Sequence, residues 1–356
     1  MKKTQIALAA LALVASSAAM ADGVKIYGTA DASVLSGANG THLFGAGNNA
    51  GSILGLTGSE DLGGGLKAGF TLEGGVSFGT GEVVNGGPDG AGYSGIFNRQ
   101  SNISLGNEAV TVTLGGQIST FVAASLTGLV GAGGNAAFVP ALSRMAGSLG
   151  GSSTGAASGN AGTGPTAGAF FYSDLATINL NLNGVSLTAQ TKVGSSNSGS
   201  GENVGKYSAY SATTSSMGVN LAVAGFSMSD AAGQGGSSYT IGGNTSVAGI
   251  TIRGAYGRGN STLVNGRGHS IGFDYSLTDA LSVGYTHAKG SWDNGTEGKV
   301  GPAGSNGSQN SISAKYSLSP KTFAYATYSS FSDLGVNASA GGTGKTITIL
   351  GVAHSF

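Results

Sequence analysis

Three features of the sequence have the residue types of catalytic or metal sites, but each lacks the context that its chemistry needs. Gly151–Gly155 (GSSTG) fits the GxSxG pattern of a serine nucleophile, yet it lies in a Gly- and Ser-rich tract without the strand and helix of a nucleophile elbow. Gly344–Thr346 (GKT) ends like a phosphate-binding loop, but Ser339 occupies the first glycine position and a strand is expected to follow. The histidines show no metal-ligand spacing: His42, His269, His287 and His354. We therefore expect no enzyme, no cofactor and no metal site.

Charged and amide side chains recur at alternate positions of segments whose other positions are apolar. Side chains two residues apart in a strand lie on the same face, so these groups would meet water on one side of a sheet. There they would contact ions and hydrophilic solutes rather than perform a reaction. A side chain that is merely solvated is the alternative for each. The predicted channel-lining residues are Lys25, Asp31, Lys67, Glu73, Gln100 and Gln117.

The alternation leaves the orientation of three residues open. Arg99 shares its parity with Ser101 and Ile103, which places it on the outer face unless a bulge shifts the register. In the segment 346–356, Ile347 and Ile349 are apolar on the side that should face the lumen.

The segments that would position these groups have the pattern of strands between lipid and water. Apolar residues alternate with polar or small ones over about ten residues, which is typical of transmembrane β-strands. The clearest examples are 24–32, 66–73, 110–115 and 172–182. The 68 glycines and 9% charged residues would also fit a disordered low-complexity chain, and this periodicity favours a fold.

Short turns alternate with long connections along the chain. Asn183-Gly184 suits a two-residue hairpin, and 62–65 and 317–321 are further short turns. Short turns at one end and long loops at the other are the asymmetry of an outer-membrane barrel. The expected long connections are rich in Gly, Ser and Asn: 35–51, 75–96, 119–167, 194–206, 230–237, 257–268, 289–309 and 332–344. Trp292 falls in one of these expected loops, and we assign it to no site.

Both ends of the sequence fit an exported barrel. Lys2 and Lys3, the apolar run 6–14 and Ala19-Met20-Ala21 predict a signal peptide over residues 1–21. Its removal leaves 14 Lys and Arg against 16 Asp and Glu, a balance that suggests no nucleic-acid partner. The absence of cysteine excludes a disulfide framework. At the other end, alternation continues to Phe356, as expected where a last strand closes on the first.

The length predicts the size of the barrel. Residues 22–356 allow roughly 16 strands at about 21 residues for each strand and connection, with strands long enough to cross when tilted. About eight strands are filled by their own side chains, whereas sixteen enclose an aqueous channel. Size alone therefore indicates a pore.

Several segments are similar to the trimeric general porins of β-proteobacteria and Neisseria. The resemblance lies in Gly55–Glu73 (GLTGSEDLGGGLKAGFTLE), Phe97–Gln117 (FNRQSNISLGNEAVTVTLGGQ), Tyr316–Tyr325 (YSLSPKTFAY) and Gly351–Phe356 (GVAHSF). It implies periplasmic termini, a homotrimer in outer-membrane lipid, and a third external loop, here 119–167, that folds into the barrel and narrows it. It also implies that Val352, His354 and Phe356 form the C-terminal signal for the barrel-assembly machinery.

Departures from the family pattern bear on ion selectivity. Family members commonly carry arginine where this chain has Gly116 and Ala353, and acidic groups in their third loop. Residues 119–167 contain no Asp or Glu and a single base, Arg144, which we take as a constriction candidate. Since fixed charges in a pore discriminate ions, we expect weak ion selectivity.

The sequence therefore predicts an all-β, 16-stranded antiparallel transmembrane barrel with short periplasmic turns and long external loops, in the outer membrane of a Gram-negative bacterium. Its expected function is passive diffusion of small hydrophilic solutes and ions. Two alternatives remain. A solute-specific porin would bind its substrate along the lumen, and a surface adhesin or structural barrel would have a plugged lumen.

Overall fold

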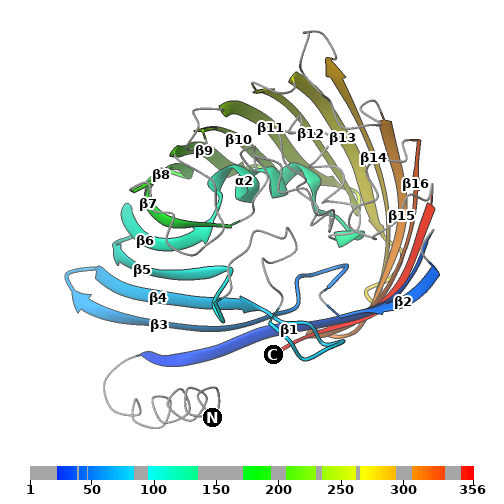
Figure 1. Ribbon diagram of the computed structural model, residues 1–356, viewed down its shortest axis with the longest axis horizontal. Coiled ribbons are helices and arrows are strands. Elements are labelled where there is room, and N and C mark those ends of the chain that lie inside the picture. Colours follow the sequence, from blue (N-terminus) through cyan, green and yellow to red (C-terminus); the bar gives the residue numbers. More distant parts are fainter. Residues whose placement is uncertain are drawn as a thin grey trace.

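In this computed structural model one antiparallel sheet closes into a barrel (Figure 1). Closure occurs at β1 (Asp22–Gly37), which pairs with β17 (Thr346–Ser355) on one edge and with β3 (Ile53–Gly63) on the other. The short β2 (Gly40–Phe44) extends the second edge, beside residues 33–37. The structure describes residues 22–37, 40–45, 47–83, 95–134, 171–193, 206–229, 235–261, 265–293, 307–332 and 346–356.

The remaining strands each pair with their neighbours in the chain, so the barrel is an up-and-down meander. With β2 counted as part of the β1–β3 connection, sixteen strands cross, and the predicted 16-stranded antiparallel barrel is confirmed. Among the described residues, no helix is long and apolar enough to cross a bilayer. The other elements are β4 (Leu66–Gly75), β5 (Gln100–Gly106), β6 (Val110–Ile118), α2 (Thr120–Leu129), β7 (Phe171–Leu182), β8 (Val185–Lys192), β9 (Lys206–Ser216), β10 (Val219–Ser229), β11 (Gly235–Val247), β12 (Ile250–Ser261), β13 (Asn265–Ser276), β14 (Leu281–Asp293), β15 (Gly307–Ser319) and β16 (Thr322–Phe331).

Tight turns join the strands at the end of the barrel where Asp22 and Phe356 lie. Asn183-Gly184 connects β7 to β8, as predicted, and both residues have positive φ, 50° and 90°. Met217-Gly218 and Ala248-Gly249 repeat this pattern between β9 and β10 and between β11 and β12. Two successive positive φ values define the type I′ hairpin turn, whose twist matches that of paired strands.

Several connections expected from the sequence are in part strand. The expected connection 35–51 contains β2 and the end of β1, and β11 begins within 230–237. β12 continues to Ser261 and β13 begins at Asn265, so most of 257–268 forms a ladder in which Gly257 pairs with Gly268 and Arg258 with Arg267. β14 likewise continues to Asp293, so Trp292 belongs to a strand and not to a loop. The expectation was wrong because pairing with a neighbouring strand outweighs the low strand propensity of Gly and Asn.

The two faces of the wall differ as a barrel in lipid requires. Large apolar side chains on outward positions are exposed, among them Ile103 (60%), Ile241 (52%) and Leu350 (58%). The apolar lumen-side residues Ile347 and Ile349 are buried in an inward cluster with Leu35, Tyr325, Phe331 and Ala353. The lumen side of β17 is thus apolar because it packs against other inward side chains.

The last residues of the chain complete the closure of the barrel. The Phe356 amide donates to the Gly28 carbonyl at 3.1 Å, and the Gly28 amide donates to the Phe356 carbonyl at 3.3 Å. The Phe356 ring lies against Gly28, where a Cβ would collide with it. Val352, His354 and Phe356 are exposed on one parity, and His354 Nδ1 lies 2.8 Å from Thr322 Oγ1.

Candidate pore and its lining

The helix α2 lies inside the barrel, between the walls (Figure 1). It begins at Ser119, whose hydroxyl accepts the Val122 amide and lies 2.7 Å from Tyr207 Oη on β9. The Thr120 amide donates to Gln190 Oε1 on β8 at 3.1 Å, and its hydroxyl lies 2.9 Å from Ser211 Oγ. The start of the predicted third loop is therefore bonded to the inner wall.

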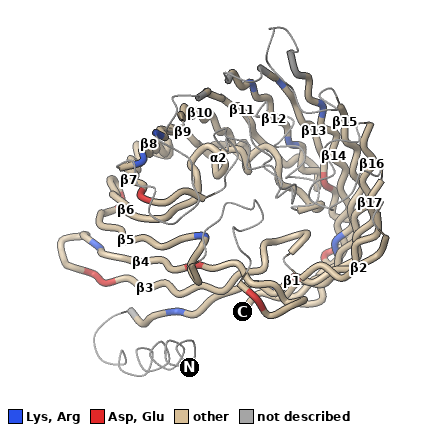
Figure 2. The backbone as a smooth tube through the Cα atoms, viewed as in Figure 1, with Lys and Arg blue, Asp and Glu red and all other residues tan. Residues whose placement is uncertain are grey.

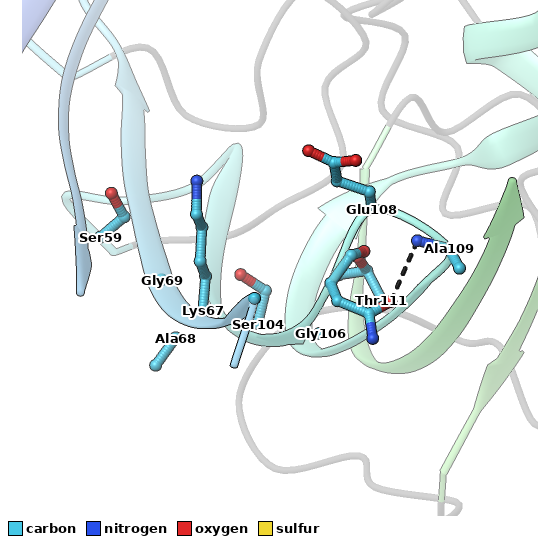
Figure 3. Close-up of a pocket in the computed structure, with 11 residues that line it drawn as sticks. Ser59, Lys67, Ala68, Gly69, Ser104, Gly106, Glu108, Ala109 and Thr111 are labelled. Carbon is cyan, nitrogen blue, oxygen red and sulfur yellow. Dashed lines mark hydrogen bonds between the residues drawn. The ribbon is translucent and has the colours of Figure 1, made fainter. Parts of the chain in front are cut away.

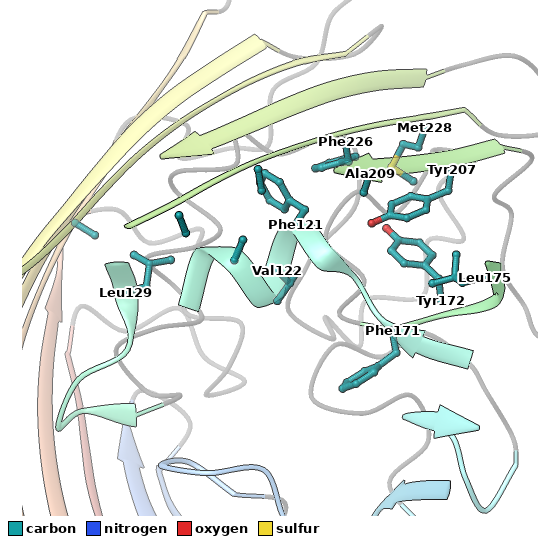
Figure 4. Packing of buried hydrophobic residues seen from close by; sticks show 14 residues of the cluster. Phe121, Val122, Leu129, Phe171, Tyr172, Leu175, Tyr207, Ala209, Phe226 and Met228 are labelled. Atoms are coloured by element: carbon teal, nitrogen blue, oxygen red, sulfur yellow. The ribbon is translucent and has the colours of Figure 1, made fainter. Parts of the chain in front are cut away.

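An apolar cluster holds the same helix against β7, β9 and β10 (Figure 4). The Phe121 ring meets Phe226 edge-on at a centroid distance of 4.7 Å, and Tyr172 stacks on Tyr207 at 4.2 Å. Gly128 packs so closely on β12 that a Cβ would collide with the Gly254 carbonyl. Because all of these groups are buried, the helix is packed on the wall as in a protein core.

An ion pair anchors the end of this segment. Arg253 on β12, 2% exposed, donates from Nε to Asp274 Oδ2 on β13 at 3.0 Å. Asp274 Oδ1 accepts the amide of Ala132 at 2.8 Å, just beyond the helix. Asn244 Nδ2 also donates to the Thr127 carbonyl at 2.6 Å. The carboxylate thus joins the barrel wall to the third loop.

A fully buried carboxylate lies on β1, five strands from β13 around the wall. Asp31 is fully buried, and its Oδ2 accepts the amides of Asn49 and Ala50 at 2.8 Å each. Tyr325 Oη donates to its Oδ1 at 2.5 Å. Asn49 in turn donates from Nδ2 to the carbonyl of Ala132 at 3.0 Å. Hydrogen bonds therefore run without interruption from β16 and β1, through residues 49 and 132, to β13.

Glu73 on β4 is the centre of a third hydrogen-bonded cluster, which includes Arg99 and Tyr27. Arg99 Nε donates to Glu73 Oε1 at 2.6 Å, and Tyr27 Oη donates to Oε2 at 2.9 Å. The Arg99 guanidinium lies 4.4 Å from the centre of the Phe171 ring. Arg99 precedes β5, so the strand parity does not govern its side chain, which reaches the interior without a bulge.

Within the described part of the chain, the other predicted lining residues form no side-chain bond to the carboxylates of these clusters, although Gln100 lies next to Glu73. Gln117 is 7% exposed and donates to the carbonyls of Thr113 and Leu175 at 3.3 Å each. Gln100 pairs with Glu73 across β4 and β5 and is partly exposed. Lys25 and Lys67 are exposed near the end with the short turns. Figure 3 shows Lys67 with Ser59, Ser104 and Glu108 around a hollow of the wall.

Two predictions fall on residues for which nothing is described. Arg144 and the part of 119–167 beyond residue 134 lie outside the described residues, and so does the signal peptide expected over residues 1–21.

Charges inside the described barrel are few and mostly paired. Figure 2 shows that most of the backbone carries no charged residue. The ion pairs are Arg99–Glu73, Arg253–Asp274 and a looser Lys192–Asp174 contact of 3.8 Å. Lys315, whose ammonium lies 4.0 Å from the centre of the Phe323 ring, faces the same side as Tyr325. Such an interior supplies hydrogen-bonding groups and little net field.

Arg253 and Asp274 are the functional residues that the sequence did not single out. Their parity within β12 and β13 places both inside, but no local motif distinguishes them from solvated lumen residues. Their importance depends on Ala132, which is 142 positions from Asp274 in the chain.

Comparison with known proteins gives consistent matches. The family described as Gram-negative porin matches residues 7–335. Outer membrane porin protein 32 of Delftia acidovorans is 45% identical over 121 residues, which are 32% of this chain and 31% of that protein, so less than a third of the relative is matched.

Solved structures share the fold at low identity. An anion-selective porin from Comamonas acidovorans has a TM-score of 0.71 at 20% identity, over 94% of this chain and 99% of that one. The trimer form of OmpT from Vibrio cholerae has 0.62 at 10%, over 94% and 99%. The outer membrane channel DcaP of Acinetobacter baumannii has 0.62 at 14%, over 96% and 99%.

Proposed function

The chain belongs to the Gram-negative porin family, and we propose that it forms a water-filled channel for passive diffusion of small hydrophilic solutes and ions. The observation that carries this proposal is a closed barrel of sixteen strands whose third long connection, between β6 and β7, enters the lumen and is fixed to the inner wall. The family and the barrel place the protein in the outer membrane, and both are those of a channel rather than of an enzyme.

The proposed mechanism needs no bound group and no conformational cycle. Water fills the part of the lumen that α2 leaves free, and the solute gradient supplies the driving force. Residues 119–167 set the size limit, because α2 occupies the cross-section and is held at both of its ends. Lys25, Lys67, Gln100 and, within the same loop, Arg144 would contact the passing solutes, whereas Asp31, Glu73 and Gln117 would shape the wall around them.

We propose weak ion selectivity with a small preference for anions. The interior carboxylates Glu73 and Asp274 are each paired with an arginine, and Asp31 is covered. The inward lysines Lys25, Lys67 and Lys315 form no ion pair with a described residue. Fixed charges of one sign favour ions of the other. The solved Comamonas porin, which its title calls anion-selective, supports the same direction.

Assembly as a homotrimer in outer-membrane lipid is also part of the proposal. The trimer form of the similar Vibrio protein supports it. We further propose that residues 1–21 are an export signal, and that Val352, His354 and Phe356 are read by the barrel-assembly machinery, since they are exposed together at the end of the closing strand.

The first test is current recording. The chain from residue 22 onward is refolded in detergent and inserted into a planar bilayer with a tenfold KCl gradient. Stepwise insertions are expected, with a reversal potential of the anion-selective sign far below the roughly 59 mV of a perfectly selective pore. Silence from verified barrels would contradict the channel and favour a plugged adhesin. Deletion of residues 125–160 then separates the two, because removing a constriction enlarges an existing current, whereas removing a plug creates one.

A further inference from the structure

Three basic side chains gather on the outer face of the barrel, at the ends of β12, β13 and β14 that lie away from the short turns. Arg258, Arg267 and Lys289 are exposed there, and blue segments mark such residues near these strand ends in Figure 2. Arg258 pairs directly with Arg267 across β12 and β13. Lys289 pairs with His269, which lies two positions from Arg267 on the same face. Neighbours of this kind lie within about 8 Å of one another.

These positions point outward because of the parity of their strands. On β12, Arg258 alternates with the buried Gly257 and Gly259 and shares its face with the exposed Tyr256 and Ile252. On β13, Arg267 shares its face with Ile271 (55% exposed) and Phe273 (49%). The charges therefore lie outside the lumen, and the pore proposed above does not use them.

The cluster lies directly beyond an apolar and aromatic band. Tyr239 and Tyr256, with ring centroids 6.4 Å apart, lie beside Arg258 on the same face. Aromatic residues in outer-membrane barrels mark the level of the lipid headgroups, with acyl chains next to the apolar residues below. The three charges consequently lie where a headgroup would contact the wall.

No described acidic side chain neutralises this cluster. None of the ion pairs within 4.0 Å among the described residues includes Arg258, Arg267 or Lys289. Like charges directly opposite each other in a sheet repel and are destabilising. An anion placed between Arg258 and Arg267 would therefore reduce the repulsion between these two residues. Arginine binds phosphate through two parallel hydrogen bonds, and basic clusters at a membrane surface bind anionic headgroups.

We propose that Arg258, Arg267 and Lys289 bind the phosphate groups of an anionic lipid in the outer leaflet. The acyl chains of this lipid would lie along the apolar residues of β12 and β13, including Ile252, Ile271 and Phe273. The site rests on the outer-membrane location and not on conduction, so either can fail without the other.

The test compares two double variants that remove equal charge. R258Q/R267Q removes the facing arginines. K206Q/K321Q is the control: Lys206 is exposed at the end of β9 away from the short turns, and Lys321 is exposed in the short turn between β15 and β16. Refolded protein in neutral detergent is titrated with diphosphorylated lipid A and with its dephosphorylated form, and bound lipid is counted by native mass spectrometry. A parallel titration with inorganic phosphate shows whether phosphate alone occupies the site.

We expect R258Q/R267Q to weaken binding of the phosphorylated lipid by roughly tenfold or more, and K206Q/K321Q to change it little. Addition of K289Q should weaken binding further. Three results would each overturn the proposal. These are an equal loss of lipid binding in both double variants, equal binding of the two lipids, and a loss of trimers without a loss of bound lipid in R258Q/R267Q. Unchanged heat-resistant migration on gels shows that the barrel is intact, whether or not it conducts. If R258Q/R267Q does not fold, the single variants R267Q and K206Q answer the same question.

Discussion

At the scale of single residues, Asp274 connects the third loop to the wall, because it accepts the Ala132 amide and pairs with Arg253. In D274N the carboxylate charge is lost, and the guanidinium of Arg253, 2% exposed, stays buried without a counter-charge. Breaking a buried pair in this way costs about 3 kcal/mol or more. We expect a lower free energy of unfolding in urea and noisier single-channel currents.

The matched control for this substitution is D279N. Asp279 lies exposed in the turn between β13 and β14, so D279N removes one negative charge, as D274N does, but outside the lumen. D279N should leave stability and current noise close to those of the original protein. Equal effects of the two substitutions would show that net charge, and not the anchoring of Ala132, is responsible.

The carboxylates illustrate which residue roles a sequence can reveal. Alternation places Asp31 and Glu73 on the inner face, because parity along a strand is a local property. Their bonds to Tyr325 and Arg99 depend on contacts between strands, with partners 294 and 26 positions away in the chain. Sequence periodicity therefore predicted the fold and the direction of these side chains, but not that Asp31 would be fully buried beneath residues 49 and 50.

At the scale of elements, closure of β1 on the end of β17 depends on Gly28. A Cβ there would meet both the Phe356 ring and the Ile53 carbonyl, so G28A forces atoms of the seam apart. Overpacking of this kind costs about 1–3 kcal/mol. We expect a smaller yield of heat-resistant barrels on gels. G23A is the control, because nothing lies within 4 Å of a Cβ at Gly23; a similar loss of yield in G23A would contradict the explanation.

The contact between α2 and β12 gives a second prediction at this scale. Gly128 lies against the Gly254 carbonyl and the Gly243 amide, so a valine would push the helix away from the wall and toward the open lumen. We expect G128V to lower single-channel conductance and to destabilise the barrel by about 1–3 kcal/mol. A123V, at a half-buried position of the same helix, should change conductance less. A larger effect of A123V would place the open lumen elsewhere.

At the scale of the whole molecule, the sign of ion selectivity follows from the unpaired inward lysines. The variant K25Q/K67Q/K315Q removes three positive charges and keeps the paired groups intact. We expect its reversal potential in a KCl gradient to move toward the cation-selective sign, with little change in conductance. K206Q/K321Q serves as the control, since neither lysine faces the lumen, and an equal shift there would show that the effect is general.

The run of hydrogen bonds from Tyr325 through Asp31, Asn49 and Ala132 to Asp274 joins β16 and β1 to β13, three and five strands away around the wall. In mechanical terms these bonds act as a cross-link along one chord of a thin-walled tube. A tube braced along one chord resists flattening when lateral pressure in the membrane rises. The aperture should therefore keep its shape under tension, so that currents recorded from a stretched bilayer would match those from a relaxed one.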